Sequence, residues 1–439
     1  VRVLSADAVQ KANSGHPGMP MGCADFAFTL WNDVLRFDPS DPNWLGRDRF
    51  VLSAGHGSML LYSLLHLFDC GLTMEDLQQF RQLGGKCPGH PEYGHTPGAE
   101  VTTGPLASGL ASAVGMAIGQ KQLQARLGGD DCLFDQKIYV LSGDGCMMEG
   151  TSHEACALAG HLQLDNLIVF YDDNGITIEG STEIALSEDV GARFAAYGWN
   201  VLRIDGQNTK QIRNALNLAR TLKNKPTLII GRTVIGTGSP KLAGSSESHG
   251  APLGVEELAA TKANLGFDPA QSFFVPPEVR AFCQETVAAK KKAAAAWNEK
   301  FASFSAGLTP ERRELLSALR NRTVPANILS ELLKAVPAKP TATRNSGGEI
   351  MQKVAALVPA LVGGSADLNP STKTYLKGAG DFGAADRAGR NIHYGVRELG
   401  MGMISNGLAL TGTAIPFCST FMVFADYMRP AIRIAAMSH

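Results

Sequence analysis

Residues 137–180 read KIYVLSGDGCMMEGTSHEACALAGHLQLDNLIVFYDDNGITIEG. One apolar run, 138–141, ends in Ser-Gly-Asp-Gly, and a second, 167–171, ends in Asp-Asp-Asn. Between the runs, Thr151 is followed three residues later by Glu154, which predicts a capping box at the start of a helix. A right-handed crossover brings the carboxyl ends of two parallel strands to one edge of a sheet. We therefore expect Asp144 and Asn174 to lie close together.

The polar groups at this predicted edge suit a hard divalent cation. The Asp144 carboxylate, the Asn174 amide oxygen and the main-chain carbonyl of Ile176 would form part of an oxygen shell for Mg²⁺, which usually completes its octahedron with phosphate oxygens and water. Gly145 allows the backbone to approach a diphosphate closely. A simple turn is the alternative, since Gly, Asp and Asn are common turn residues. The second strand end favours the ligand site.

The composition is that of an ordinary globular protein. The chain has 439 residues, of which 44% are hydrophobic and 18% charged, and this length suggests about three domains. A net charge of -1 gives no field that would attract nucleic acid or an anionic membrane, and no apolar run is as long as a membrane span. The eight cysteines, at 23, 70, 87, 132, 146, 156, 283 and 418, form no CxxC pair. They indicate a reducing, cytoplasmic location.

Strand and helix patterns alternate along the chain. This order predicts an α/β fold with a doubly wound, mostly parallel sheet and helices on both faces. Further buried strands are expected at 201–204 and 227–234. We assign residues 1–308 to this first domain, the polar segment 309–340 to a linker, and 341–439 to the first part of a second α/β domain of similar type.

Four histidines lie in loops that are rich in glycine, proline or serine. His16 lies in NSGHPGMPMG, His56 in LSAGHGS, His90 in CPGHPE and His249 in SESHG. Such loops present an imidazole outside any helix face. A single loop histidine is usually only solvated, but the company of the others favours a shared site.

Glu398 is the main candidate for proton transfer. It follows a predicted strand, 392–396, and begins an apolar helix. A carboxyl group in such a place can exchange a proton with a ligand, and Phe421, after the next strand, could stack on an aromatic ring. Alternatively, Glu398 only complements the helix dipole.

Nine segments together resemble the transketolase family, and they extend over essentially the whole chain. They are SGHPGMPMG, LSAGHGS, TTGPLASGLASAVGMA, SGDGCMMEGTSHEA, DDNGITIEG, GSSESHGAPLG, ATRNSGGEI, GGSADLNPS and HYGVRELGMG. The resemblance implies thiamin diphosphate as cofactor together with Mg²⁺, or Ca²⁺ or Mn²⁺ in its place, and it implies that the metal is held by Asp144, Asn174 and Ile176. The implied cofactor contacts are His56, Gly104, Leu106, Gly145, Asn174, His249, Asp367, Glu398 and Phe421. The implied substrate contacts are His16, His90, His249, Arg344 and Ser371, with Glu398, His249 and His16 as catalytic residues.

The resemblance also implies an activity and an assembly. The activity is reversible transfer of a two-carbon ketol group from a ketose phosphate to an aldose phosphate, through a thiamin-diphosphate carbanion intermediate, in the pentose phosphate pathway. The cofactor would lie between the subunits of a homodimer, with Glu398 supplied by the partner. In this family the chain continues through the rest of the pyrimidine-binding domain and a C-terminal domain.

Other functions stay open at this point. Another thiamin-diphosphate enzyme, such as 1-deoxyxylulose-5-phosphate synthase or dihydroxyacetone synthase, is the near alternative. A non-catalytic fragment that binds the cofactor is an alternative of a different class. An NAD-dependent Rossmann enzyme is disfavoured because no strand runs into GxGxxG, and a zinc hydrolase because His153-Glu154 lacks the HExxH spacing.

Overall fold

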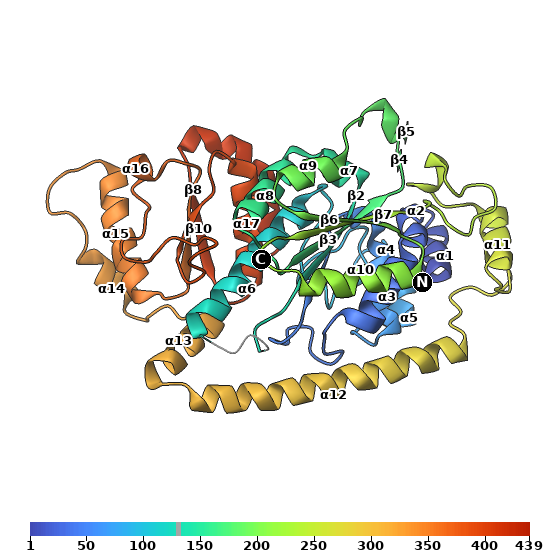
Figure 1. Ribbon diagram of the computed structural model, residues 1–439, viewed down its shortest axis with the longest axis horizontal. Coiled ribbons are helices and arrows are strands. Elements are labelled where there is room, and N and C mark those ends of the chain that lie inside the picture. Colours follow the sequence, from blue (N-terminus) through green and yellow to red (C-terminus); the bar gives the residue numbers. More distant parts are fainter. Residues whose placement is uncertain (129–132) are drawn as a thin grey trace.

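Five parallel strands form the first sheet, in the order β1-β2-β3-β7-β6 (Figure 1). They are β1 (Arg49–Leu52), β2 (Ile138–Gly143), β3 (Leu167–Asp173), β6 (Asn200–Asp205) and β7 (Thr227–Arg232). The computed structural model describes residues 1–128 and 133–439, so Cys132 lies outside the described residues. In the central pair, Gly143 lies opposite Asp172. The predicted α/β class and its mostly parallel sheet are confirmed.

Helices cover both faces of this sheet because its strands are apolar on both sides. Tyr139 and Leu141 of β2 pack into one core cluster, and Ile138 and Val140 pack into another. The first cluster includes residues of α1 (Arg2–Ala12), α3 (Ala24–Thr29), α4 (Ser58–Leu67) and α10 (Thr209–Thr221), and the second includes residues of α6 (Ser108–Leu127) and α8 (Gly150–His161). The sheet is thus fixed from both sides, which leaves its carboxyl edge free for a site.

The second domain has a three-stranded parallel sheet in the order β10-β8-β9. Its elements are α15 (Thr343–Leu357), β8 (Leu361–Ser365), α16 (Asn369–Thr372), β9 (Asn391–His393), α17 (Glu398–Leu410), β10 (Ile415–Ser419) and α18 (Arg429–Met437). Helix α17 packs tightly on α6, since a Cβ on Gly407 would lie 1.8 Å from the Ser112 carbonyl oxygen. A Cβ on Gly115 would lie 1.9 Å from that of Ile404. This backbone contact joins the two domains.

The first domain ends in a long helix, α12 (Pro277–Gly307), which runs along the bottom of the molecule in Figure 1. The segment 309–340 then contains α13 (Pro310–Asn321) and α14 (Ile328–Leu333). The other helices are α2 (Gly18–Gly22), α5 (Met74–Gln78), α7 (Asp144–Met148), α9 (Val190–Ala196) and α11 (Val255–Asn264). Among the described residues, every helix is too short or too polar to cross a bilayer.

Two details of the sequence prediction are wrong. Thr151 is not a cap, because the extra helix α7 leads into α8, which begins one residue earlier, at Gly150. Its partner in the predicted capping box, Glu154, instead accepts a hydrogen bond from the Gly400 N–H at 2.7 Å. The strand at 201–204 is half-exposed rather than buried, because β6 is the edge strand of the sheet.

Candidate functional site

The carboxyl edge of the first sheet carries the residues predicted to bind a cation. Asp144 directly follows β2 and Asn174 directly follows β3. Ile176 begins a short antiparallel pair, β4 (Ile176–Thr177) and β5 (Gly180–Ser181), which projects beyond the sheet edge (Figure 1). All three residues line one cavity of about 460 Å³. Two strand ends far apart in sequence therefore present oxygen ligands to a common space.

Asp144 is held in a state that favours a positively charged partner. Its Oδ1 accepts a hydrogen bond from the Tyr171 hydroxyl at 2.6 Å, whereas no donor among the described residues reaches its buried Oδ2. The pKa of Asp144 is raised to about 7, mainly by burial and also by the nearby Asp172 and Asp173, against the opposite effects of Tyr171 and the Gly175 N–H. A bound cation would satisfy the free oxygen and compensate the buried charge.

Asn174 is oriented by the carboxylate of Asp172. The Asn174 Nδ2 donates to Asp172 Oδ2 at 2.8 Å, which directs the amide oxygen the other way, where it accepts from the Ile176 N–H at 2.8 Å. Thr233 donates to the other oxygen of Asp172. The amide oxygen keeps a second lone pair that can bind a ligand.

These donors fit a divalent cation of the magnesium type. The chain offers one carboxylate, one amide oxygen and one carbonyl, and this incomplete set suits an ion that keeps phosphate and water ligands. The described part of the chain has no cluster of three or more His, Cys, Asp and Glu side chains that could hold a metal alone. The free Oδ2 of Asp144 is the observation that favours an ion here.

Four histidines line the same cavity. The ring centroid of His16 lies 5.1 Å from that of His56, 5.8 Å from that of His249 and 6.4 Å from that of His90. The rings of His56 and His249 are stacked, with centroids 5.1 Å apart. The Nδ1 atoms of His16 and His249 are buried and find no partner in the regions described. Loops separated by up to 233 positions, from His16 to His249, thus build one cluster of ring nitrogens.

The histidines are neutral at physiological pH. The pKa of His16 is lowered to about 4 and that of His56 to about 3, mainly by burial and in addition by the neighbouring rings. Burial also lowers the pKa of His90 and His249. A neutral imidazole both donates and accepts a hydrogen bond, so this cluster suits hydroxyl and carbonyl groups better than an anion.

Two positions of the cavity wall favour glycine. Gly104 has φ +140°, which side chains rarely adopt. A Cβ on Gly145 would lie 2.7 Å from Leu106 Cδ1. Because Gly145 has no side chain, Leu106 packs directly against the backbone that follows Asp144.

The cavity brings together ten of the residues named from sequence. They are His16, His56, His90, Gly104, Leu106, Asp144, Gly145, Asn174, Ile176 and His249. The structure does not bring the other five there. Asp367 and Glu398 line a separate cavity with Phe424 and Tyr427, and Phe421 is 42% exposed. Arg344 is exposed near the start of α15, and Ser371 is half-buried in α16.

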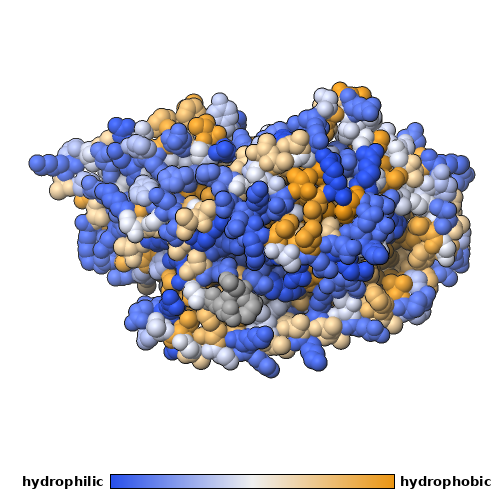
Figure 2. All heavy atoms as spheres, in the orientation of Figure 1, coloured by the Kyte–Doolittle hydropathy of each residue, from blue (hydrophilic) through white to orange (hydrophobic). Residues whose placement is uncertain are grey.

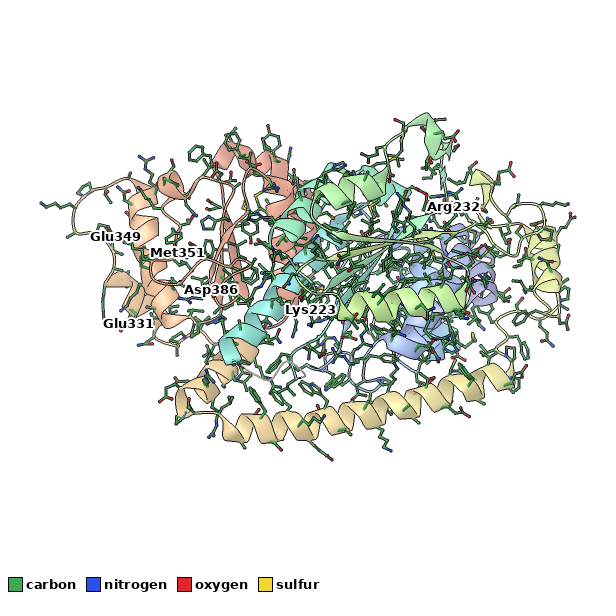
Figure 3. The ribbon with its side chains drawn as sticks, in the orientation of Figure 1. Lys223, Arg232, Glu331, Glu349, Met351 and Asp386 are labelled. Atoms are coloured by element: carbon green, nitrogen blue, oxygen red, sulfur yellow. The ribbon has the colours of Figure 1, made fainter. Side chains whose placement is uncertain are left out.

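The rim of the first cavity includes apolar residues of the β4–β5 projection. Ile178 is 72% exposed and Ile184 is 63% exposed, and both also line the cavity. Figure 2 shows apolar residues at the tip of this projection, among other apolar and hydrophilic areas of the same face. Beside it, at the end of β7, Arg232 contacts Asp173, with Nη1 3.4 Å from Oδ1 (Figure 3).

Sequence reasoning missed the residues that position the ligands. Tyr171 and Asp172 lie inside the predicted strand or directly after it, and only their partners reveal a role. Asp172 was the first polar residue after an apolar run, and this signal could have identified it. Met19 and Ile235 also line the cavity, but nothing in their sequence context separates them from core residues.

Two family models match the chain. The model for the transketolase thiamine diphosphate binding domain matches residues 1–325, and the model for the transketolase pyrimidine binding domain matches residues 339–439. Both agree with the resemblance seen in the motifs.

Similar proteins support the same family. A transketolase of Geobacillus stearothermophilus is 49% identical over 442 residues, covering 100% of this chain and 66% of that protein. A solved transketolase from Leishmania mexicana superposes with a TM-score of 0.95 at 41% identity. A Pichia stipitis transketolase solved in complex with sedoheptulose 7-phosphate superposes with a TM-score of 0.94 at 45% identity. Both structures cover 100% of this chain, which covers 66% of each of them. The chain therefore spans about two thirds of the length of these relatives.

Proposed function

The chain belongs to the transketolase family, and we propose that it carries out reversible transfer of a two-carbon ketol group from a ketose phosphate to an aldose phosphate with thiamin diphosphate and Mg²⁺. The observation that carries this proposal is the shared cavity, in which the cation ligands Asp144 and Asn174 lie together with the histidine cluster. A cofactor diphosphate and a polyhydroxylated substrate both find suitable partners there.

The cation ligands would hold the diphosphate end of the cofactor. Asp144, Asn174 and the Ile176 carbonyl would bind the metal, and His56, Gly104, Leu106 and Gly145 would form the surrounding wall. When bound, thiamin diphosphate supplies a thiazolium ring that accepts electrons as the bond next to a carbonyl breaks.

The neutral histidines would bind the substrate and transfer the protons of its hydroxyl groups. The Nδ1 atoms of His16 and His249 are buried without a partner in the described structure, so a sugar hydroxyl could complete their hydrogen bonding. A neutral ring nitrogen can take the hydroxyl proton and return it later, which is the general acid–base role. His90, at the same cavity, would bind a further hydroxyl or carbonyl oxygen.

We propose that the second domain acts in a homodimer. Glu398, Asp367 and Phe421 would meet the cofactor of the partner chain, and Arg344 and Ser371 its sugar phosphate. Their position away from the cation cavity of their own chain supports this assignment. Arg344 is suited to phosphate because a guanidinium pairs with it bidentately.

We propose the domain limits 1–308, 309–340 and 341–439. The end of α12 at Gly307 supports the first limit, and the second family match, which begins at residue 339, supports the second. We also propose a cytoplasmic location, supported by the free thiols of the seven described cysteines.

An assay of ketol transfer from xylulose 5-phosphate to ribose 5-phosphate tests the function. Turnover that requires both thiamin diphosphate and Mg²⁺ is expected. Activity only with pyruvate as donor would instead favour a 1-deoxyxylulose-5-phosphate synthase. Cofactor binding without any turnover would identify a non-catalytic cofactor-binding chain.

A further inference from the structure

Arg81 lies behind the histidine cluster, in the turn that follows α5, and its backbone is left-handed. Its φ is +60°, in the left-handed region that residues other than glycine rarely adopt. Its Nε is buried and finds no partner in the parts of the chain described here. A strained backbone and an unsatisfied donor both cost stability, and such costs are commonly retained where they serve a site.

The guanidinium of Arg81 contacts the loops on either side. Its Nη1 donates to the Ser14 hydroxyl at 3.1 Å, two residues before His16. On the other side, a Cβ on Gly89 would lie 3.0 Å from the Arg81 Cζ. Gly89 directly precedes His90, so its missing side chain leaves the space that the guanidinium fills.

Two further contacts fix Arg81 in this place. Its N–H donates to the Cys87 carbonyl at 2.9 Å, and its Cζ lies 5.5 Å from the centroid of the Phe80 ring. Phe80 packs closely on the first loop, since a Cβ on Gly15 would lie 2.8 Å from its Cε1. The pair Phe80–Arg81 therefore supports both loops at once.

We propose that Arg81 is a positioning residue for the histidine cluster: its guanidinium holds together the loops that carry His16 and His90. Only the importance of Arg81 for catalysis rests on the proposed function. The positioning itself is a property of the chain without cofactor or substrate.

The positive charge of Arg81 has a second effect on the same histidines. It disfavours their protonated forms, and it contributes to the lowered pKa of both His16 and His90, after the larger effect of burial. The other groups that act on His16 are the rings of His90 and His249, and the carboxylate of Glu92 acts in the opposite direction on His90. The His56 ring also packs against His16. Arg81 is the one permanent cation in this group.

The test is a histidine titration by NMR on the 439-residue chain with labelled imidazoles, without cofactor. Arg81→Gln keeps a polar side chain but removes the positive charge and the branched guanidinium group. It is expected to raise the pKa of His16 and His90. Arg280→Gln is the matched control, since Arg280 Nη2 lies 2.7 Å from His66 Nε2, outside the site. It is expected to move the pKa of His66 upward and leave His16 and His90 unchanged.

Unchanged titration of His16 and His90 in folded Arg81→Gln protein would overturn the proposal. If that variant does not fold, Arg81→Lys decides, because lysine keeps the charge on a flexible stem but lacks the branched guanidinium group. A smaller rise in the pKa of both histidines is then expected, and unchanged pKa values would overturn the proposal. These outcomes do not depend on turnover, so failure of the proposed enzyme function would appear separately, in the ketol-transfer assay.

Discussion

The Tyr171 hydroxyl donates a hydrogen bond of 2.6 Å to one oxygen of Asp144, and the other oxygen of that carboxylate is buried without a partner in the described chain. One half of the carboxylate is thus anchored to the sheet, and the other half keeps its hydrogen-bonding capacity for a ligand. This arrangement is expected of a metal ligand whose direction is fixed by a second residue.

Asp144→Asn should abolish cation-dependent cofactor binding. The amide has nearly the same shape but lacks the charge, so we expect the affinity for thiamin diphosphate in the presence of Mg²⁺ to fall at least about a hundredfold, whereas Tyr171→Phe, which removes only the orienting hydrogen bond, should cost about tenfold. Calorimetric titration with Mg²⁺ or with EDTA measures both. Equal affinity of Asp144→Asn and the unchanged protein would refute the ligand assignment.

The histidine cluster should make the protein sensitive to acid. The folded-state pKa values of His16 and His56, about 4 and about 3, lie below the unfolded value of 6.5. Their contribution to stability is therefore present above pH 6.5 and is lost as the pH falls toward 4 and 3. Thermal unfolding between pH 7 and pH 4 should show a shallower loss of Tm for His56→Gln than for the unchanged protein. The exposed His161, replaced by Gln, serves as control; identical slopes for all three proteins would contradict the prediction.

Gly407→Ala should destabilise the contact between α6 and α17. The added methyl group would meet the Ser112 carbonyl at 1.8 Å, where backbone rather than a flexible side chain must move, so we expect a loss of about 3 kcal/mol or more. Gly347→Ala is the matched control, because Gly347 lies exposed within α15 and a Cβ there meets nothing within 4 Å. That change should stabilise by about 0.5–1 kcal/mol. Denaturant unfolding measures both, and a neutral Gly407→Ala would disprove the close packing.

Glu398→Ala should separate cofactor binding from proton transfer. If Glu398 serves as the proton-transfer group of the proposed dimer, its removal should slow hydrogen–deuterium exchange at C2 of bound thiamin diphosphate at least about a hundredfold, while the affinity for the cofactor changes less. Glu349→Ala, at an exposed position of α15, is the control. Exchange at the normal rate in Glu398→Ala would remove this role.

The sequence predicted correctly that the two central strands are neighbours and that Asp144 and Asn174 lie at one cavity, because two local rules apply to them. An apolar run marks a buried strand, and parallel strands with one crossover must end at the same edge. The ends of β2 and β3 follow these rules, so the sequence alone pairs Asp144 with Asn174.

The contacts that orient the site could not be read in the same way. Arg81 lies in a segment without periodicity, and its role depends on Ser14 and Gly89, which only the folded chain brings beside it. Likewise, Thr151 fits a local capping pattern, but α8 begins after a bend that follows α7, and Glu154 bonds to the Gly400 N–H instead of capping the helix. Tertiary contacts override local preference at such positions.

A crystal structure with thiamin diphosphate and Mn²⁺ tests the central claim most directly, because the anomalous signal locates the ion. We expect one peak about 2.0–2.6 Å from an Asp144 carboxylate oxygen, the Asn174 amide oxygen and the Ile176 carbonyl oxygen, with diphosphate oxygens completing the shell. A cofactor bound with its metal elsewhere, and with Asp144 bonded to Tyr171 alone, would contradict the central claim.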